Sequence, residues 1–441
     1  MIRILQWVVL GIACPCALLN GSARAQVNIM IDVGRGPVTV HVPAGYDPGV
    51  PAPLVVLLHG YGVTGAQQEQ YFKFTPLSDQ YGFILTYPDG MIDLLGNRFW
   101  NATNACCNFF ASGVDDSTYL LDLVTAIEAQ LSVDPRRIYS AGHSNGGFMS
   151  YRLACDHPGK FAAIASLAGA TFANPASCAP VSPVYVLQMH GTLDTTIFYG
   201  GGSLLGMSYP GAVATVQQWA SFGGCSPVGV PGASNLDLDA SIPGAETIVT
   251  HYSTGCQPAG SAELWTIVGG SHSPALSSQF GPRVVEFLLA HPKPDPGRVY
   301  CTAKTNSCGA LPAISSSGLP SASSTSGFTV QAAGAKALKA GLLIYTDSGR
   351  ALPATPFLGG WLCINAAPLK RSVAVVDTSG TPGACDGTLA IDVNAFAAGT
   401  LGGNPIPSLR IPGTQVNCQF WGRDTLSGAL LSDALDYLVS P

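Results

Sequence analysis

The sequence contains few charged side chains. They make up 10% of its 441 residues, and the formal net charge is −6. Proteins that bind nucleic acids carry clustered Lys and Arg for phosphate contacts, but the 20 basic residues here form no basic patch. We therefore expect no nucleic-acid partner. Low charge with many small and apolar residues is typical of a secreted protein that faces an uncharged or insoluble substrate.

The apolar run at the N-terminus is too short and too early to act as a functional membrane span. It follows Met1-Ile2-Arg3, and an A-x-A motif at Ala23-Arg24-Ala25 comes after it. This pattern predicts a signal peptide over residues 1–25 and an extracellular protein with no membrane contact after cleavage. A lipoprotein anchor at Cys14 is an alternative, but the residue three positions before it is an unfavourable glycine.

Cysteine is plentiful. Of 13 cysteines, two lie in the signal peptide and 11 remain. In a secreted chain such residues form disulfides. We expect four pairs, Cys155–Cys178, Cys225–Cys256, Cys301–Cys308 and Cys363–Cys385. Adjacent Cys106 and Cys107 are expected to bond elsewhere or to leave one thiol free, and the odd total leaves at least one thiol unpaired or intermolecular.

The segment Gly142-His143-Ser144-Asn145-Gly146-Gly147 fits G-x-S-x-G, the nucleophile elbow of α/β-hydrolases. Glycines leave room for the tight strand-to-helix turn that exposes the serine hydroxyl. Residues 137–141 predict the strand before this turn, and residues 148–154 predict the helix after it. Further strands and helices alternate along residues 26–290, which indicates a mostly parallel sheet with helices on both faces.

The residues that would act with Ser144 follow in the order of this fold, an acid and then a histidine. Asp194 comes after a predicted strand at 183–189, and His272 lies in a glycine-flanked loop after a strand at 263–268. Loops after parallel strands meet at one edge of the sheet. We assign Ser144 as nucleophile, His272 as general base and then acid, and Asp194 as the group that orients His272. Two other acids compete less well, since one follows the elbow helix and one begins a strand: Asp156 and Glu263.

Two backbone amides are needed to stabilise the oxyanion that develops during acyl transfer. One comes from the residue after the nucleophile, Asn145. The other is expected from the loop after the strand at 53–58, with Tyr61 as the first choice and Gly62 as the second. Tyr61 and Trp100 are also candidate substrate-binding residues, although packing explains each of them equally well.

His59, His143 and His190 all fall at predicted strand ends near Ser144. A metal site is conceivable there, but no Cys/His or acidic spacing supports one. We expect these histidines to pack and form hydrogen bonds around the elbow, with no metal ligands among them.

The sequence changes in character after the helix predicted at 283–290. Residues 291–299 form a Pro-rich linker, and residues 300–441 contain short β-rich runs separated by Gly, Pro and Ser. This predicts a smaller all-β, sandwich-like domain behind the catalytic one. The Ser-rich stretch 315–326 is expected to be a loop inside this domain, with a linker as the alternative.

About residues 30–290 resemble the secreted α/β-hydrolases grouped as poly(3-hydroxybutyrate) depolymerases and feruloyl esterases. The matching stretches are 40–47, 57–62, 114–116, 134–139, 142–147, 190–194 and 269–272. The resemblance implies a serine esterase without a cofactor, acting on plant cell-wall hydroxycinnamoyl esters or on polyesters, with Ser144, Asp194 and His272 as its triad. In the family an aromatic residue and proline commonly follow the histidine, whereas Ser273-Pro274 stands here, which affects the leaving-group pocket.

The C-terminal region resembles a module found on secreted bacterial proteins, whose role does not follow from the resemblance. Three of its aromatic residues form either a polymer-binding face or, more simply, part of the core: Trp361, Phe420 and Trp421. Our leading interpretation is a secreted carboxylic ester hydrolase of the feruloyl esterase type. A polyester depolymerase is the alternative, and a catalytically inactive binding protein with the same fold is a third hypothesis. The sequence does not indicate an oligomeric state.

Overall fold

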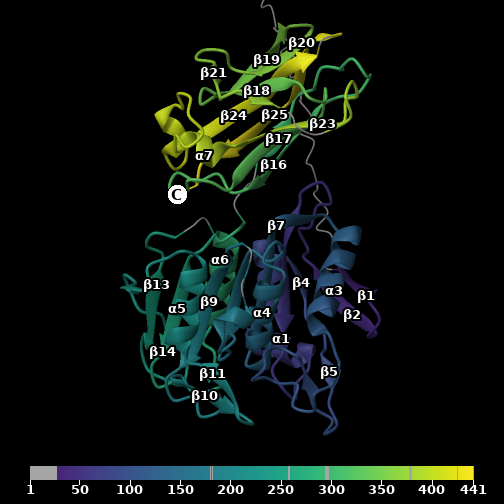
Figure 1. Cartoon of the computed structure of the whole chain (residues 1–441). Helices are drawn as coiled ribbons and strands as arrows, with labels where there is room; N and C mark the ends of the chain where they lie inside the picture. Colours follow the sequence, from purple (N-terminus) through teal and green to yellow (C-terminus); the bar gives the residue numbers. More distant parts are fainter. Residues whose placement is uncertain are drawn as a thin grey trace, which may run out of the picture.

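The computed structural model describes residues 27–178, 180, 182–256, 259–293, 297–376, 380–424 and 426–440. The predicted signal peptide lies outside these residues. Figure 1 shows an α/β part formed by residues up to about 290 and a β-rich part formed by the residues that follow. Among the described residues, no helix is long and apolar enough to cross a membrane.

The α/β part is built on a ten-stranded sheet in which the strands from β4 to β14 run parallel and the strands at both edges are antiparallel. In spatial order the strands are β1 (Val27–Asp32), β2 (Pro37–Val42), β4 (Ile84–Thr86), β3 (Ala52–Leu58), β7 (Val133–His143), β8 (Ala163–Leu167), β9 (Tyr185–Gly191), β14 (Ala262–Ile267), β13 (Thr247–Tyr252) and β12 (Val230–Pro231). The predicted strand–helix alternation is confirmed, and the arrangement is that of an α/β-hydrolase.

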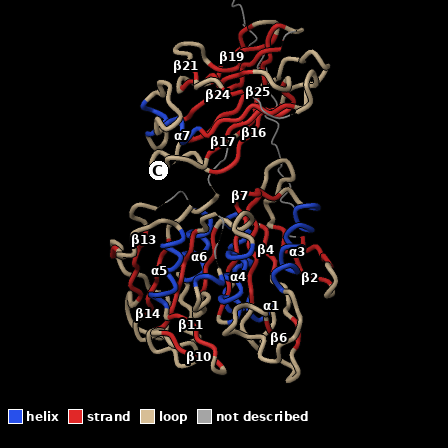
Figure 2. Tube along the Cα trace, viewed as in Figure 1, coloured by secondary structure: helices blue, strands red, loops and turns tan. Residues whose placement is uncertain are grey.

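Helices cover both faces of this sheet (Figure 2). They are α1 (Gly65–Phe72), α2 (Phe74–Tyr81), α3 (Asp116–Gln130), α4 (Asn145–Asp156), α5 (Ala212–Phe222) and α6 (Phe280–Ala290), with a short 3-10 turn at η1 (Pro175–Ser177). Alternate residues of a strand point to opposite faces. Accordingly Leu54 and Val56 of β3 pack with α3 and α4, whereas Val55 packs with α2 and α6. The sheet is therefore buried on both sides, which explains its continuous apolar runs.

Two small hairpins extend from loops beyond the carboxyl ends of the parallel strands. They are β5 (Met91–Ile92) with β6 (Arg98–Phe99), and β10 (Gly201–Leu204) with β11 (Met207–Pro210). Both lie at the end of the α/β part that is far from the β-rich part in Figure 1.

The C-terminal part consists of antiparallel sheets that share a core. One sheet contains β15 (Arg298–Tyr300), β25 (Gly428–Leu438), β24 (Gln415–Asp424), β18 (Ala340–Thr346), β21 (Lys370–Arg371) and β22 (Val375–Val376). A three-stranded sheet of β16 (Ala313–Gly318), β17 (Phe328–Ala335) and β23 (Gly387–Asp392) packs on it. The hairpin β19 (Arg350–Phe357)–β20 (Gly360–Ile364), α7 (Val393–Ala397) and η2 (Pro407–Arg410) complete this part. The Ser-rich stretch 315–326 begins inside β16, and its residues 319–326 form a loop beside these sheets, so the expected loop is preceded by four strand residues.

The aromatic residues singled out in the C-terminal part lie at different depths. Phe420 is completely buried in the core between the sheets, Trp421 is partly buried, and Trp361 on β20 is 47% exposed. They therefore do not form one continuous aromatic face.

The disulfides only partly follow the expected pairs. Cys155–Cys178 and Cys225–Cys256 are confirmed. The expected pairs Cys301–Cys308 and Cys363–Cys385 are wrong, because the structure contains Cys301–Cys363 and Cys308–Cys385. Both observed bonds join strands or loops that the sheets bring together from distant positions in the chain. The expectation that the two adjacent cysteines bond elsewhere is also wrong, since Cys106 and Cys107 are bonded to each other. Cys418 in β24 is a free, buried thiol.

Candidate active site

Ser144 occupies a tight turn between β7 and α4. Its backbone has φ 53° and ψ −118°, and non-glycine residues rarely adopt a positive φ. The neighbouring glycines are needed for close backbone contact: a Cβ on Gly146 would lie 2.1 Å from Leu58 O, and one on Gly142 would lie 2.4 Å from Gly146 O. The Ser144 amide donates to Leu167 O of β8 at 2.8 Å, which fixes the turn to the sheet.

The three residues assigned as a triad lie in one line of hydrogen bonds. Ser144 Oγ is 3.0 Å from His272 Nε2, and His272 Nδ1 is 2.8 Å from Asp194 Oδ2. Asp194 follows β9 and His272 follows β14, so adjacent parallel strands place both loops at the same edge of the sheet. Ser144 and His272 are half-buried, whereas Asp194 is 4% exposed.

Four N–H donors surround the Asp194 carboxylate. Oδ1 accepts from the amides of Thr196 and Ile197, both at 2.8 Å. Oδ2 lies 3.2 Å from His190 Nε2 in addition to its contact with His272. Burial alone would raise the pKa of Asp194, but the hydrogen bonds from His190, His272 and Ile197 outweigh it and hold the pKa well below its usual range. Asp194 is therefore an anion throughout the pH range in which His272 can act as a base.

The three strand-end histidines are all hydrogen-bonded to protein groups. His59 Nδ1 donates to Gly60 O at 2.7 Å, and its Nε2 accepts from the Gly90 amide at 2.8 Å. His143 Nε2 donates to the carbonyl of His272 at 2.9 Å. Burial lowers the pKa of His59 and of His143 to about 4, so both rings are neutral at pH 7. Within the described part of the chain, no group of Cys, His and acidic residues is arranged to hold a metal ion.

Two backbone amides near Ser144 are available to a ligand. Neither the Tyr61 amide nor the Asn145 amide donates to any described residue, whereas the Gly62 amide donates to Arg98 O at 2.8 Å. This distinguishes Tyr61 from its alternative, Gly62, as a second donor beside Asn145. The two available amides stand at the end of β3 and at the first residue of α4, on either side of the serine.

The Asn145 side chain has a role that the motif did not indicate. Its Oδ1 accepts from the Trp100 amide at 2.7 Å, and its Nδ2 donates to Trp100 O at 3.0 Å and to Cys106 Sγ at 3.5 Å. The first residue of the elbow helix therefore holds the loop that carries the Cys106–Cys107 disulfide. No sequence signal reveals this clamp, because it joins segments 45 residues apart through backbone groups.

The two candidate substrate-binding residues are placed differently. Trp100 has no exposed surface, and its indole N–H donates to His59 O at 3.1 Å, so it packs behind the site and not on its surface. Tyr61 is half-buried beside Phe109, with ring centroids 5.4 Å apart. Its hydroxyl donates to Asp93 and accepts from Asn97 Nδ2, which ties the loop after β3 to the β5–β6 hairpin.

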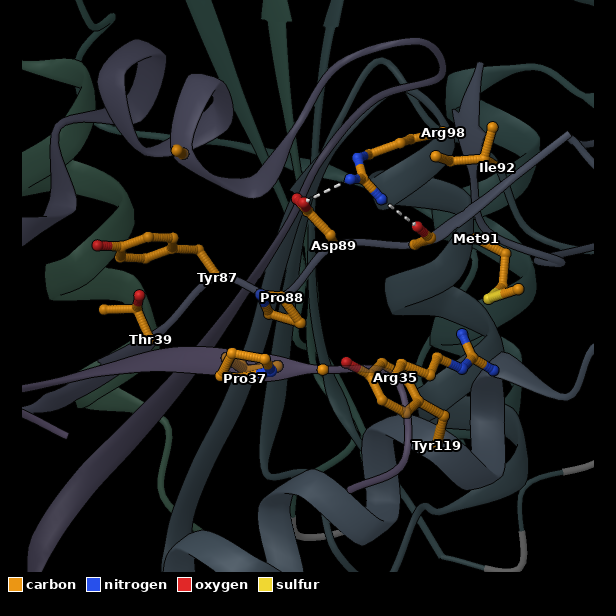
Figure 3. A pocket seen from close by; sticks show the side chains of 14 residues that line it. Arg35, Pro37, Thr39, Tyr87, Pro88, Asp89, Met91, Ile92, Arg98 and Tyr119 are labelled. Atoms are coloured by element: carbon orange, nitrogen blue, oxygen red, sulfur yellow. Dashed lines mark hydrogen bonds and ion pairs between the residues drawn. The ribbon is translucent and has the colours of Figure 1, made fainter. Parts of the chain in front are cut away.

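A cavity of about 400 Å³ opens near this hairpin (Figure 3). It is lined by side chains that include Arg35, Tyr87, Asp89 and Tyr119, and by none of the triad. Arg98 lies in its wall, paired with Asp89 at 3.2 Å and donating to Gly90 O at 3.0 Å, as Figure 3 shows. The cavity is thus separate from Ser144, His272 and Asp194.

Apolar side chains are exposed on the loops near the triad. Leu94 is 83% exposed at the tip of the β5–β6 hairpin, and Leu205 is 80% exposed at the tip of the β10–β11 hairpin. Leu193, next to Asp194, and Phe198 are also exposed. The triad thus lies among loops that present apolar groups to solvent.

Comparison with known proteins agrees with this geometry. Residues 40–220 match the family described as esterase PHB depolymerase. The chain is 32% identical to a putative esterase, NocK, from Nocardia uniformis subsp. tsuyamanensis (33% of this chain, 43% of the relative). It is 29% identical to feruloyl esterase B from Piromyces equi (43% and 36%) and 30% identical to poly(3-hydroxyalkanoate) depolymerase C from Paucimonas lemoignei (45% and 46%). The chain thus spans less than half of each of these relatives. Over residues 40–220, the chain is therefore similar to the esterase PHB depolymerase family.

Proposed function

We propose that the protein is a serine carboxylic ester hydrolase that works through an acyl-enzyme. The observation that carries the proposal is the unbroken line of hydrogen bonds from Ser144 Oγ through His272 to Asp194. A nucleophile, a base and an orienting acid in this geometry form the standard arrangement for acyl transfer. An inactive binding protein would not need to retain all three groups in register, so this third hypothesis is the weakest.

In the proposed mechanism, Ser144 Oγ attacks the ester carbonyl carbon while His272 Nε2 takes the hydroxyl proton. The carbonyl oxygen becomes an oxyanion and accepts from the Tyr61 and Asn145 amides. His272 then gives its proton to the departing alcohol, and the acyl group remains on Ser144. A water molecule then attacks the acyl carbonyl carbon while His272 Nε2 takes one of its protons. The bond to Ser144 Oγ breaks, the carboxylic acid is released, and His272 returns the proton to Ser144 Oγ. Asp194 stays ionised and stabilises the imidazolium in both halves.

We propose a feruloyl esterase as the substrate type, with polysaccharide-linked hydroxycinnamoyl esters cleaved outside the cell. Similarity to feruloyl esterase B supports this choice, and the five disulfides fit an oxidising compartment. In this proposal residues 26–290 form the catalytic domain, residues 291–299 form the linker, and residues 300–441 form a separate module.

A polyester depolymerase is the second candidate, and a specific observation favours it. Exposed Leu94, Leu193 and Leu205 lie on loops at the triad end of the sheet, and few charges are present to oppose contact with a water-insoluble polymer. Similarity to poly(3-hydroxyalkanoate) depolymerase C points in the same direction.

Two substrates separate these candidates. Wild type and Ser144→Ala would be assayed on methyl ferulate and on a suspension of amorphous poly(3-hydroxybutyrate). Faster hydrolysis of methyl ferulate supports the feruloyl esterase, faster release of hydroxybutyrate supports the depolymerase, and both activities should vanish in Ser144→Ala. If residues 300–441 hold the polymer, their removal should lower only hydrolysis of the suspension; unchanged polymer hydrolysis would contradict that role.

A further inference from the structure

The hydrogen-bond line of the triad continues behind Asp194 into the core. His190, near the end of β9, places Nε2 at 3.2 Å from Asp194 Oδ2, the oxygen that also contacts His272 Nδ1. The His190 residue is 1% exposed, so water cannot replace this contact. No sequence motif of the elbow or of the triad order assigns a role to this histidine.

The tautomer of His190 is fixed by Gln188, two residues earlier on the same face of β9. Gln188 is completely buried, and its Nε2 lies 2.8 Å from Gly169 O and 3.2 Å from His190 Nδ1. Because a carbonyl oxygen can only accept, the Gln188 atom that faces Gly169 must be the amide nitrogen. Its other hydrogen therefore goes to His190 Nδ1, and the single ring hydrogen of a neutral His190 sits on Nε2.

The far end of this line is also anchored. Tyr151 of α4, which is 0% exposed, donates its hydroxyl to Gln188 Oε1 at 2.8 Å. His190 Nε2 also lies 2.7 Å from Ile197 O, in the loop whose amide bonds to Asp194 Oδ1. A helix, a strand and the acid loop are therefore joined by one buried network.

We propose that His190 is a positioning residue for the reaction, acting through Asp194. This inference rests on the proposed function of Ser144, His272 and Asp194. The amides of Thr196 and Ile197 already occupy Oδ1. The single Nε2–H of His190 is shared between Ile197 O at 2.7 Å and Asp194 Oδ2 at 3.2 Å, so it adds a second, weaker donor to Oδ2 and limits rotation of the carboxylate. The same N–H shares Oδ2 with His272 and so weakens the attraction between Asp194 and a protonated His272.

The proposal predicts a change in pH dependence when the His190 donor is lost. Without it, Asp194 attracts the His272 imidazolium more strongly, so His272 keeps its proton to higher pH. The other ionisable groups that face these two rings are few: His143 lies 5.0 Å from the His272 ring between centroids, and Tyr199 lies 5.7 Å from the His190 ring. The acid limb of the pH profile, which is the rise of kcat/KM with increasing pH, should therefore move to higher pH. The value of kcat should fall because Asp194 is less well held.

Two substitutions of His190 test this proposal, because both introduce a side-chain amide but place it at different distances from the backbone. In His190→Gln the amide nitrogen reaches about as far as Nε2 and can still donate to Asp194. In His190→Asn it reaches only as far as Nδ1 and faces Gln188. With p-nitrophenyl butyrate between pH 5 and 9, we expect His190→Asn to move the acid limb up by about half a pH unit or more and to lower kcat by about tenfold at unchanged KM. His190→Gln should keep the limb in place and restore most of kcat.

Two further variants complete the design. His41 is another buried histidine with an aspartate partner, Asp79 at 3.1 Å, but it lies on β2 away from the triad. His41→Asn should change stability and leave the acid limb where it is. Gln188→Met keeps His190 but frees its hydrogen to move to Nδ1, so the limb should shift upward as in His190→Asn.

Two results would overturn the positioning role of His190. An acid limb at the wild-type position in His190→Asn, or in Gln188→Met if His190→Asn does not fold, overturns the positioning role. Equal loss of activity in His190→Asn and His190→Gln without a limb shift shows a structural role only and also overturns it. Full activity in Ser144→Ala would instead overturn the proposed function, which keeps the two failures distinct.

Discussion

Substituting Gly146 with alanine should inactivate the protein although alanine is the better helix former. A Cβ at this position would lie 2.1 Å from Leu58 O, 2.5 Å from Leu58 C and 2.8 Å from His59 O. These are backbone atoms that no rotamer change can move away. Since non-bonded carbon atoms pack at about 3.5–4.0 Å, α4 and the end of β3 must separate by roughly 1 Å.

That separation acts directly on the proposed oxyanion site, because α4 carries the Asn145 amide and the end of β3 leads to the Tyr61 amide. A misplacement of about 1 Å costs on the order of 100-fold in rate, so kcat/KM for p-nitrophenyl butyrate should fall by about that factor in Gly146→Ala. Helix propensity alone predicts a gain of about 1 kcal/mol in the free energy of unfolding, whereas overpacking predicts a loss of about 1–3 kcal/mol.

The matched control is Gly159→Ala in the turn after α4. No atom lies within 4 Å of a Cβ placed there, so both activity and thermal stability should stay at wild-type values. Gly146→Ala with kcat/KM within twofold of wild type would refute the argument that the two amides must stand at a fixed separation. A loss of the same size in Gly159→Ala would show that any glycine replacement near α4 is harmful, and would refute it as well.

Three other predictions concern His59, Cys418 and Tyr61. Because burial lowers the pKa of His59 from 6.5 to about 4, the unfolded chain binds more protons between these values; the free energy of unfolding should fall by about 3 kcal/mol from this residue as pH drops from 6.5 to 4. Urea unfolding of His59→Gln should show a flatter pH dependence, and an unchanged slope would contradict it. Cys418 is a free, buried thiol among the described residues, so in protein that lacks residues 1–25 iodoacetamide should label one cysteine in denaturant and none in the native state; native labelling would contradict the structure. Tyr61→Phe removes the hydrogen bonds that the Tyr61 hydroxyl forms with Asp93 and Asn97. The activation free energy for kcat/KM should rise by about 1 kcal/mol. Wild-type kinetics would show that the β5–β6 hairpin does not position the Tyr61 loop.

The order of elements and the alignment of Ser144, His272 and Asp194 could be predicted because the signals are local. A G-x-S-x-G turn needs glycines at fixed positions, and parallel strands bring the loops holding Asp194 and His272 to one edge whatever the intervening sequence. The same reasoning predicts oxyanion donors at the Asn145 and Tyr61 amides, with Gly62 as the second choice after Tyr61. The bond from the Gly62 amide to Arg98 O, which favours Tyr61, has no sequence signal.

Features that depend on packing between distant segments could not be predicted. The expected C-terminal disulfides join cysteines that are near each other in sequence, whereas the structure pairs Cys301 with Cys363 and Cys308 with Cys385. The sequence fits Trp100 equally well to a pocket wall or to packing; the structure buries it in the core, and its backbone is held by Asn145 through contacts that have no sequence signature.

The central claim is that Ser144 becomes acylated, and covalent labelling tests it most directly. The protein would be treated with phenylmethylsulfonyl fluoride, and the intact mass and the peptide containing residues 138–152 would be measured, with Ser144→Ala in parallel. The account predicts one adduct per chain, on Ser144, with loss of p-nitrophenyl butyrate hydrolysis in proportion to labelling and no adduct in Ser144→Ala. An adduct on another residue, or full hydrolysis by Ser144→Ala, would contradict it.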